Sequence, residues 1–179
     1  MKPIILTLFS ALAILTAAPK DIPRQGEKDW VDARYAKVKF GPFVSGHIAT
    51  PKGGTYKGIA IRVGEKGEGT MVFDTDLCTW RAGWTGGFLK TDPTRYGLIR
   101  ALKPDGKIFF ANPPIPGVAD AKGSFADPRQ VKHGPLPETY VRYKGLYVSE
   151  NRIVVRYDLG ETEIYDSPWM NKGQDGTDR

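Results

Sequence analysis

Apolar residues recur at every second position in two separate parts of this chain. The larger apolar residues of these repeats are Ile59, Ile61 and Val63 in the first part and Ile153, Val155 and Tyr157 in the second. A period of two residues places such side chains on one face of a β-strand. The pattern therefore predicts strands with one buried face in both parts of the chain.

Glycine- and proline-containing turns separate further short apolar stretches, which extends the β prediction. Strands are predicted at residues 43–50, 56–63, 70–75, 77–84, 107–111, 139–148, 152–159 and 162–165, with the fourth of them read as a strand or a strand with a bulge. Many short strands with little helix are typical of an antiparallel β-sandwich or a related barrel. Residues 112–137 contain six prolines. We expect this segment to be an ordered, irregular excursion, which is often functional or packed over a sheet.

The start of the chain has the pattern of a secretory signal peptide. Lys2 precedes an apolar run at residues 4–17, and small residues follow at Ala17 and Ala18. A run of this length and flanking is typical of a cleaved leader. We expect residues 1–18 to be removed, leaving an exported, periplasmic or extracellular protein without a membrane span.

The rest of the chain is predicted to form one domain. Residues 19–40 are polar and are expected to be a lead-in, which could include a short helix from Asp29. Residues 41–169 are expected to form a single β domain. Residues 170–179 are polar and are expected to be a flexible tail.

Charge and cysteine content exclude several kinds of function. The net charge is +6, but basic and acidic residues are interleaved, and no block of five basic residues supports nucleic acid binding. Cys78 is the single cysteine and cannot form an internal disulfide. With only His47 and His133 beside it, the chain lacks the ligands of a c-type haem or a structural zinc site. We expect no metal or other cofactor, and we expect Cys78 to be buried and unreactive.

The stretch at residues 73–88, FDTDLCTWRAGWTGGF, holds the residues with most chemical interest. Asp74 and Asp76 would point to the same side of a regular strand and repel each other unless paired. They could bind a cation or a hydroxylated ligand, or serve as the two carboxylates of a glycosidase. The alternative is structural: the aspartates would accept hydrogen bonds from backbone amides or pair with Arg62 or Arg81.

Two tryptophans in this stretch are candidates for a sugar-binding platform. Trp80 and Trp84 are four residues apart and would share a face of a straight strand. An exposed indole face suits the apolar face of a sugar ring, whereas the alternative is that both rings belong to the core. Gly83, Gly86 and Gly87 are expected to bend the chain, with Gly86 at positive φ. The candidate binding residues are therefore Asp74, Asp76, Trp80, Trp84, Arg62 and Arg81, and no residue is assigned a catalytic or metal-binding role.

Five phrases of the sequence occur together in a known family. They are Phe40-Gly41-Pro42-Phe43, Phe73-Asp74-Thr75-Asp76-Leu77, Ala82-Gly83-Trp84-Thr85-Gly86-Gly87-Phe88-Leu89, Gly134-Pro135-Leu136-Pro137 and Tyr143-Lys144-Gly145-Leu146-Tyr147. Over residues 28–168 the chain resembles a domain of unknown function found near the front of large secreted bacterial proteins. Some of those proteins also carry c-type cytochrome or sugar-dehydrogenase-like modules. The resemblance implies a secreted β module, argues against redox activity in this chain, and supplies no catalytic residues.

Three functions are compatible with these observations. The first is a non-catalytic module that binds a glycan or another secreted protein. The second is a carbohydrate-active enzyme that uses Asp74 or Asp76. The third is a structural module that docks onto a cytochrome-bearing partner. A flat aromatic strip favours binding, a cleft with opposed carboxylates favours the enzyme, and buried tryptophans without a cleft favour the third.

Overall fold

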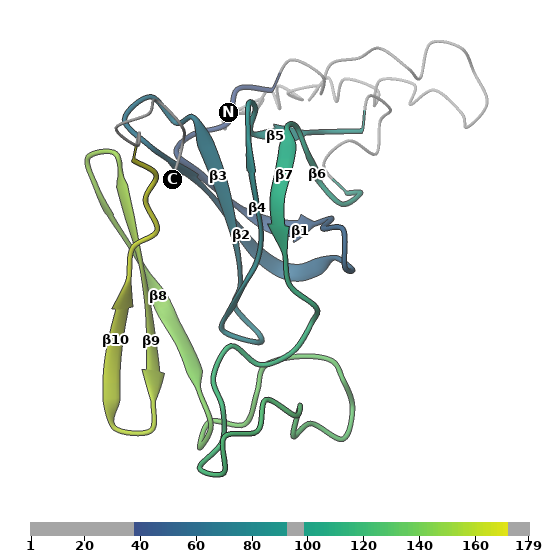
Figure 1. The fold of residues 1–179 in the computed structure, drawn as a ribbon, viewed down its shortest axis with the longest axis vertical. Helices are drawn as coiled ribbons and strands as arrows, with labels where there is room; N and C mark the ends of the chain where they lie inside the picture. The colour runs from purple at the N-terminus through teal and green to yellow at the C-terminus, as the bar shows by residue number, and fades with distance from the viewer. Residues whose placement is uncertain (1–37, 93–98, 172–179) are drawn as a thin grey trace, which may run out of the picture. The chain divides into compact units, whose positions relative to one another are not determined.

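The structure is a computed structural model that describes residues 38–92 and 99–171. The predicted signal peptide and nearly all of the lead-in and the tail lie outside the described residues. Within them the regular elements are all strands (Figure 1). They are β1 (Phe43–Ile48), β2 (Thr55–Val63), β3 (Gly69–Asp74), β4 (Thr79–Thr85), β5 (Leu89–Lys90), β6 (Lys103–Pro104), β7 (Lys107–Ala111), β8 (Arg142–Ser149), β9 (Arg152–Leu159) and β10 (Thr162–Asp166).

The largest sheet has five strands in the order β1-β2-β3-β4-β7, and all its pairs are antiparallel. Its first four strands follow chain order, so short turns connect them, as the glycine-rich segments between the predicted strands indicated. A three-stranded antiparallel sheet has the order β10-β9-β8, and β5 pairs with β6. The last pair was missed by the sequence prediction, because two-residue strands carry no readable periodicity.

One face of the five-stranded sheet packs against the three-stranded sheet. The larger apolar residues of β2, namely Ile59, Ile61 and Val63, meet Ile153 and Val155 of β9 in a cluster that we call the inter-sheet core. These are the residues whose two-residue period predicted buried strand faces. Burial of such side chains is worth about 1.5–3 kcal/mol each. This cluster is therefore a major source of the stability of the domain.

The opposite face of the five-stranded sheet is buried as well. Ala60, Val72, Ala82 and Trp84 form a second cluster with Ile48, Phe88, Leu89 and Leu102, which we call the outer core. Leu102 is held there by a parallel bridge to Ile48. Because both faces of the sheet are buried, β2 and β4 carry small apolar residues, Ala60 and Ala82, where they pack in the outer core.

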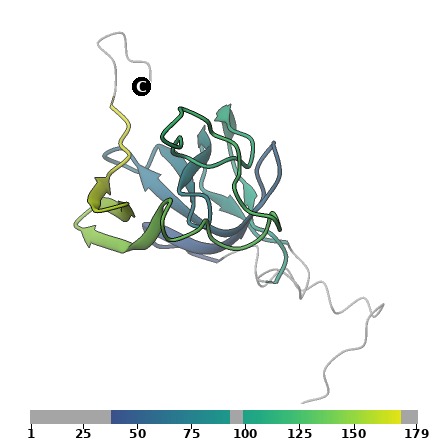
Figure 2. The ribbon, with the colours of Figure 1, turned by 90° about the horizontal axis from the view of Figure 1, so that it is seen from below.

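The excursion at residues 112–137 runs across one end of the five-stranded sheet. Figures 1 and 2 show it beyond the turn that connects β3 and β4. Two backbone hydrogen bonds hold it there. The Gly117 N–H donates to the Leu77 carbonyl and the Leu136 N–H donates to the Asp76 carbonyl, each at 2.9 Å. The excursion is thus hydrogen-bonded to the β3–β4 turn and lies beside that end of the sheet.

The predicted all-β antiparallel fold is confirmed. In the part of the chain that the structure describes, none of the sheets closes into a barrel, so of the two predicted architectures the layered one is found. Within the described part of the chain, no helix has the length and apolar character that a membrane crossing requires.

Candidate functional site

The turn between β3 and β4 is built by Asp74, the last residue of β3. Its Oδ1 accepts hydrogen bonds from the backbone N–H of Asp76 at 3.1 Å and of Leu77 at 3.3 Å. A side chain that bonds backbone amides two and three residues ahead stabilises a turn in place of a continued strand. β4 therefore begins at Thr79, two residues later than predicted, and Asp76 lies in the turn and not on a strand.

Arg81 is the polar centre of this end of the sheet. Its side chain has no exposed surface, and it donates hydrogen bonds to the Asp74 carboxylate at 3.2 Å and to the Asn112 carbonyl at 3.2 Å. Its second terminal nitrogen donates to the carbonyls of Lys52 and Gly53, both at 3.0 Å. One guanidinium thus joins the turn, the β1–β2 connection and the excursion, and the fork of five donors in arginine suits this task.

Asp74 and Arg81 form a buried ion pair. Burial raises the pKa of Asp74, while the backbone amides of Leu77 and Asp76 and the charge of Arg81 oppose that rise. Burial also lowers the pKa of Arg81, and the charge of Asp74 opposes the fall. Both shifts show that desolvation is the larger effect, as expected for charges taken out of water. The pair holds structure in place and has little surface to offer a ligand.

A β-bulge at Arg81 separates the two tryptophans. Val72 pairs with Ala82, but Phe73 pairs with Trp80, so Arg81 is one extra residue on β4. An extra residue in a strand moves the side chains that follow it to the opposite face of the sheet from the one their spacing predicts. Trp80 therefore lies on the side of the inter-sheet core, and Trp84 lies in the outer core. The shared face expected for a straight strand is wrong for this reason.

Neither tryptophan presents a broad open face. Trp84 is 0 % exposed, and its indole N–H donates to the carbonyls of Gly87 at 3.1 Å and Phe88 at 2.8 Å. Trp80 is partly buried, meets Phe73 edge on at 5.0 Å between ring centroids, and donates to Asp166 at 2.8 Å. Buried indoles with satisfied N–H groups are typical of core residues.

Arg62 lies away from the aspartates. It pairs with Thr70, four residues along the ladder from the pair of Gly58 with Asp74. Its guanidinium lies over the Phe88 ring at 4.1 Å and its Nε donates to the Gly41 carbonyl at 3.3 Å. Of the predicted binding residues, the structure brings together Asp74, Asp76 and Arg81 and leaves Arg62, Trp80 and Trp84 elsewhere.

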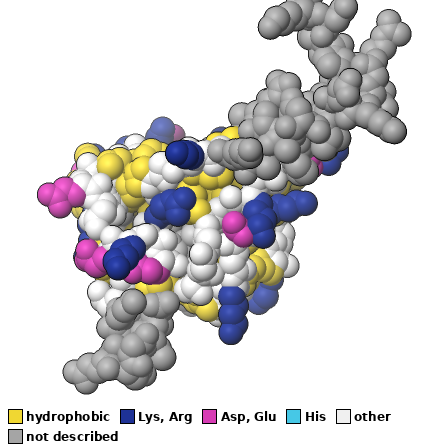
Figure 3. Space-filling model, turned by 90° about the horizontal axis from the view of Figure 1, so that it is seen from above, with side chains coloured by type: hydrophobic (Ala, Val, Ile, Leu, Met, Phe, Trp, Pro, Cys, Tyr) yellow, Lys and Arg dark blue, Asp and Glu magenta, His cyan; other side chains and the backbone are white. Residues whose placement is uncertain are grey.

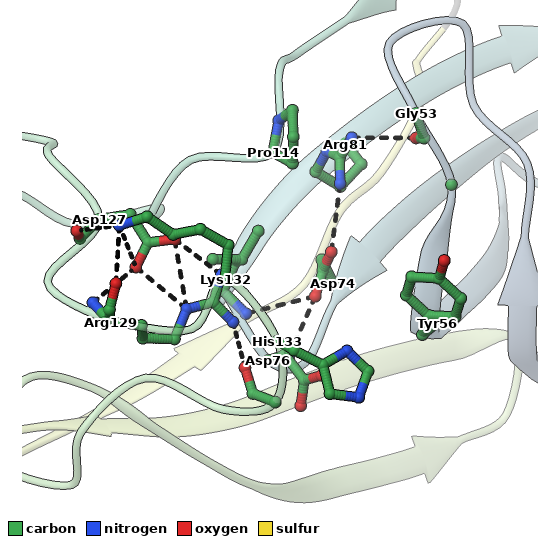
Figure 4. A pocket seen from close by; sticks show the side chains of 13 residues that line it. Gly53, Tyr56, Asp74, Asp76, Arg81, Pro114, Asp127, Arg129, Lys132 and His133 are labelled. Carbon is green, nitrogen blue, oxygen red and sulfur yellow. Dashed lines mark hydrogen bonds and ion pairs between the residues drawn. The ribbon is translucent and has the colours of Figure 1, made fainter.

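A pocket of about 510 Å³ opens at this end of the sheet (Figure 4). Four parts of the chain line it: the β1–β2 connection with the start of β2, the β3–β4 turn, Arg81 of β4, and the excursion. The residues of the excursion that line it are Pro114, Asp127, Arg129, Lys132, His133 and Gly134. A volume of this size is in the range of small-molecule sites. The excursion, which was expected to be functional or to pack over a sheet, thus forms part of a cavity wall.

The wall formed by the excursion is held by a second ion pair. Arg129 donates from Nε at 3.0 Å and from Nη2 at 2.8 Å to the two oxygens of Asp127, and from Nη1 to the Gly134 carbonyl. These bonds lower the pKa of Asp127 and raise the pKa of Arg129. The negative charges of Asp76 and Asp74 raise the pKa of Arg129 further. A two-pronged pair of this kind fixes the position of both groups.

The most exposed aromatic residue of the pocket is Tyr56. Its exposed fraction is 68 %, although His47 stacks on its ring at 4.8 Å between centroids and His133 meets it edge on at 5.9 Å. Figure 4 shows Tyr56 on the side of the pocket away from Asp127 and Arg129. Sequence reasoning missed Tyr56, Asp127 and Arg129. The signal available for the last two was their place in the proline-rich excursion.

The pocket combines both charges with an aromatic ring. Of the acids in the pocket, Asp76 has the loosest pairing: its Oδ1 lies 3.7 Å from the Lys57 Nζ. The Lys132 side chain is 61 % exposed. Among the described residues, no three His, Cys, Asp or Glu side chains are grouped so that they could hold a metal ion. On the face that Figure 3 shows, Lys and Arg side chains are scattered among acidic and apolar ones, which is not the stripe expected of a phosphate-binding surface.

Fold and site together define an all-β protein with a polar pocket, bordered by an aromatic ring, at one end of its largest sheet. Residues 71–166, more than half of the chain, match a protein family described as Domain of unknown function (DUF6797). The chain belongs to this family. A comparison with curated proteins found no match, and neither did a comparison with solved structures.

Proposed function

We propose that this protein is an exported, non-catalytic binding module and that its pocket holds a glycan. The observation that carries the proposal is the pairing of an exposed ring, Tyr56, with charged donors and acceptors around one cavity of about 510 Å³. The apolar face of a sugar ring packs on an aromatic ring, while its hydroxyl groups bond to polar groups at the rim.

Preorganisation supports binding as the task of this site. The lining side chains Arg81, Arg129 and Asp127 are held by bonds to backbone or to each other before any ligand arrives. A site that is ordered in advance loses less entropy when it binds. The Lys132 ammonium is held as well, by the carbonyls of Asp127 and Arg129 at 2.7 and 2.8 Å, but its side chain is 61 % exposed. Tyr56, Lys132 and the turn residue Asp76 are our candidates for direct contact with the ligand.

A hydrolase receives less support from the same geometry. Glycosidases use two carboxyl groups that flank the bond to be cleaved. Both oxygens of Asp74 are occupied, one by two backbone amides and the other by Arg81, and its residue is only 5 % exposed. Asp76 alone does not make such a pair, so we favour binding without catalysis.

Export is the second component of the proposal. It rests on the leader-like pattern at residues 1–18 and on the resemblance to domains near the front of large secreted bacterial proteins. Mass spectrometry of the protein from its native host tests this component. A mature start near residue 18 or 19 is expected, and an intact Met1 in the major species would overturn it.

The test of glycan binding is an array experiment with the purified protein and two matched variants. Tyr56→Ala removes the exposed ring of the pocket, whereas the control Tyr165→Ala removes another exposed ring, at 54 % against 68 % for Tyr56, on the three-stranded sheet. We expect binding to a restricted set of glycans, weakened at least tenfold by Tyr56→Ala, which corresponds to about 1.4 kcal/mol, and unchanged by Tyr165→Ala. Absence of binding to any arrayed glycan contradicts the proposal.

A further inference from the structure

A second hollow of about 310 Å³ lies beside the pocket. It is bordered by Ser45 and Gly46 of β1, by residues 57–59 of β2, and by Thr75 and Tyr143. Among the described residues that border either space, Tyr56 is the one they share. The two hollows therefore meet at the ring that we assign to ligand contact.

Glycines surround the point where the hollows meet. Gly54 precedes Tyr56, Gly58 follows it on β2, and Gly46 pairs with Gly58 across the ladder. At these three positions only backbone borders the hollows; a Cβ at Gly58 would point toward Thr55 and Ile48, and one at Gly54 toward His47. Tyr56 borders both hollows, so a ligand in contact with it can extend from one into the other.

The two hollows also differ in chemistry. The pocket contains three acids and three basic residues, whereas the second hollow has the hydroxyl-bearing Ser45, Thr75 and Tyr143 and a single charged residue, Lys57. Lys57 lies 3.7 Å from Asp76, so polar groups continue from one hollow into the other. The second hollow suits an uncharged, hydroxyl-rich unit, and the pocket suits a unit with more or stronger polar groups.

We propose that the ligand is a chain of at least two linked sugar units that lies across Tyr56, with one unit in the pocket and the next in the second hollow. This inference rests on the proposed function, because it specifies the class of glycan that the site takes. A single sugar unit would occupy one hollow and leave the other to water. Each additional unit that is held contributes contacts without a new loss of overall translational freedom.

The experiment compares chain lengths. The glycan that binds best on the array is cut to fragments of one to six units, and the affinity of each is measured by titration calorimetry. The variant Ser45→Trp places a large side chain in the second hollow, and Ser149→Trp, at an exposed serine at the end of β8, is its control. We expect affinity to rise at least tenfold from one unit to two or three and then to level off.

The variants show where the added units bind. Ser45→Trp is expected to remove the gain from the second unit while keeping the affinity for one unit, which also shows that the pocket is intact. Ser149→Trp is expected to behave like the unsubstituted protein. Equal affinity for one unit and for longer fragments overturns this inference and leaves glycan binding in place. A length-dependent gain that survives Ser45→Trp overturns the route through the second hollow, and absence of all glycan binding overturns both proposals.

Discussion

The two ends of strand β4 are built on different physical principles. At its start, Arg81 is buried and donates four hydrogen bonds, one to a carboxylate and three to carbonyls of other segments. At its other end, Trp84 is buried among apolar side chains, and Gly86 and Gly87 follow. The first end faces the pocket and the second faces the outer core. The comparison shows that one short strand stabilises two parts of the domain in different ways. At the pocket it does so through a buried charge with hydrogen bonds, and in the outer core through burial of an apolar side chain.

The largest expected effect is at the apolar end. Replacing Trp84 with Ala removes a fully buried indole and should lower the free energy of unfolding by about 3–5 kcal/mol. Urea denaturation followed by circular dichroism measures this loss. Because Trp84 does not line the pocket, the folded variant should keep its glycan affinity. A loss below about 1 kcal/mol would show that the outer core does not depend on this ring.

A substitution at the polar end of β4 should cost a similar amount of stability but should also affect binding. Arg81→Met leaves the Asp74 carboxylate buried without its partner, which should cost about 3–5 kcal/mol. It should also weaken glycan binding, because Arg81 holds the β1–β2 connection and the excursion at the pocket. The double variant Arg81→Met, Asp74→Asn removes the unpaired charge and should recover part of the stability. Unchanged binding in a folded Arg81→Met variant would contradict the difference between the two ends.

A smaller effect is expected where the chain leaves β4. Gly86 has a φ of 106°, and a Cβ there would meet only the Gly106 Cα, at an ordinary 3.9 Å. The cost of Gly86→Val should therefore come from backbone strain and amount to about 1–3 kcal/mol. Gly41→Val is the control, since Gly41 has open space and no positive φ. Equal urea midpoints for the two variants would show that the bend after β4 does not require glycine.

The smallest expected response is that of Cys78. Its exposed fraction is 4 %, and burial, with the charge of Asp74, raises the pKa of its thiol to about 12. Since the thiolate is the reactive form, an aromatic disulfide reagent at pH 8 should not label the native protein. Labelling in urea provides the control. Rapid labelling of the native protein would show that the turn beside Asp74 opens readily.

Periodicity predicted the strands well because the inter-sheet core uses one side chain of every two. Ile59, Ile61 and Val63 follow that rule, and so do Ile153 and Val155. The prediction for Trp80 and Trp84 was wrong because one bulge residue reverses the facing of a strand. Arg81 gives no sign in the sequence that it is that residue, since its burial depends on partners from three distant segments.

The pocket was harder to predict than the sheet. Its residues come from the β1–β2 connection and the start of β2, the β3–β4 turn, Arg81 of β4 and the excursion, and their proximity follows from tertiary packing. Asp74 and Asp76 were identified as a pair, but the structure assigns them different environments. Tyr56 gave no local signal, because a tyrosine in a strand is usually a packing residue. Its exposure and its place in the pocket are visible only in the three-dimensional structure.

The position of β2 has a practical consequence for anyone producing this domain. The family match begins at Met71, on β3, yet β2 lies beside β3 in the sheet and supplies Ile59, Ile61 and Val63 to the inter-sheet core. A protein cut to residues 71–166 would present β3 as an unpaired, apolar edge, which is a known route to aggregation. Recombinant expression should therefore begin before β1, whatever boundary the sequence family suggests.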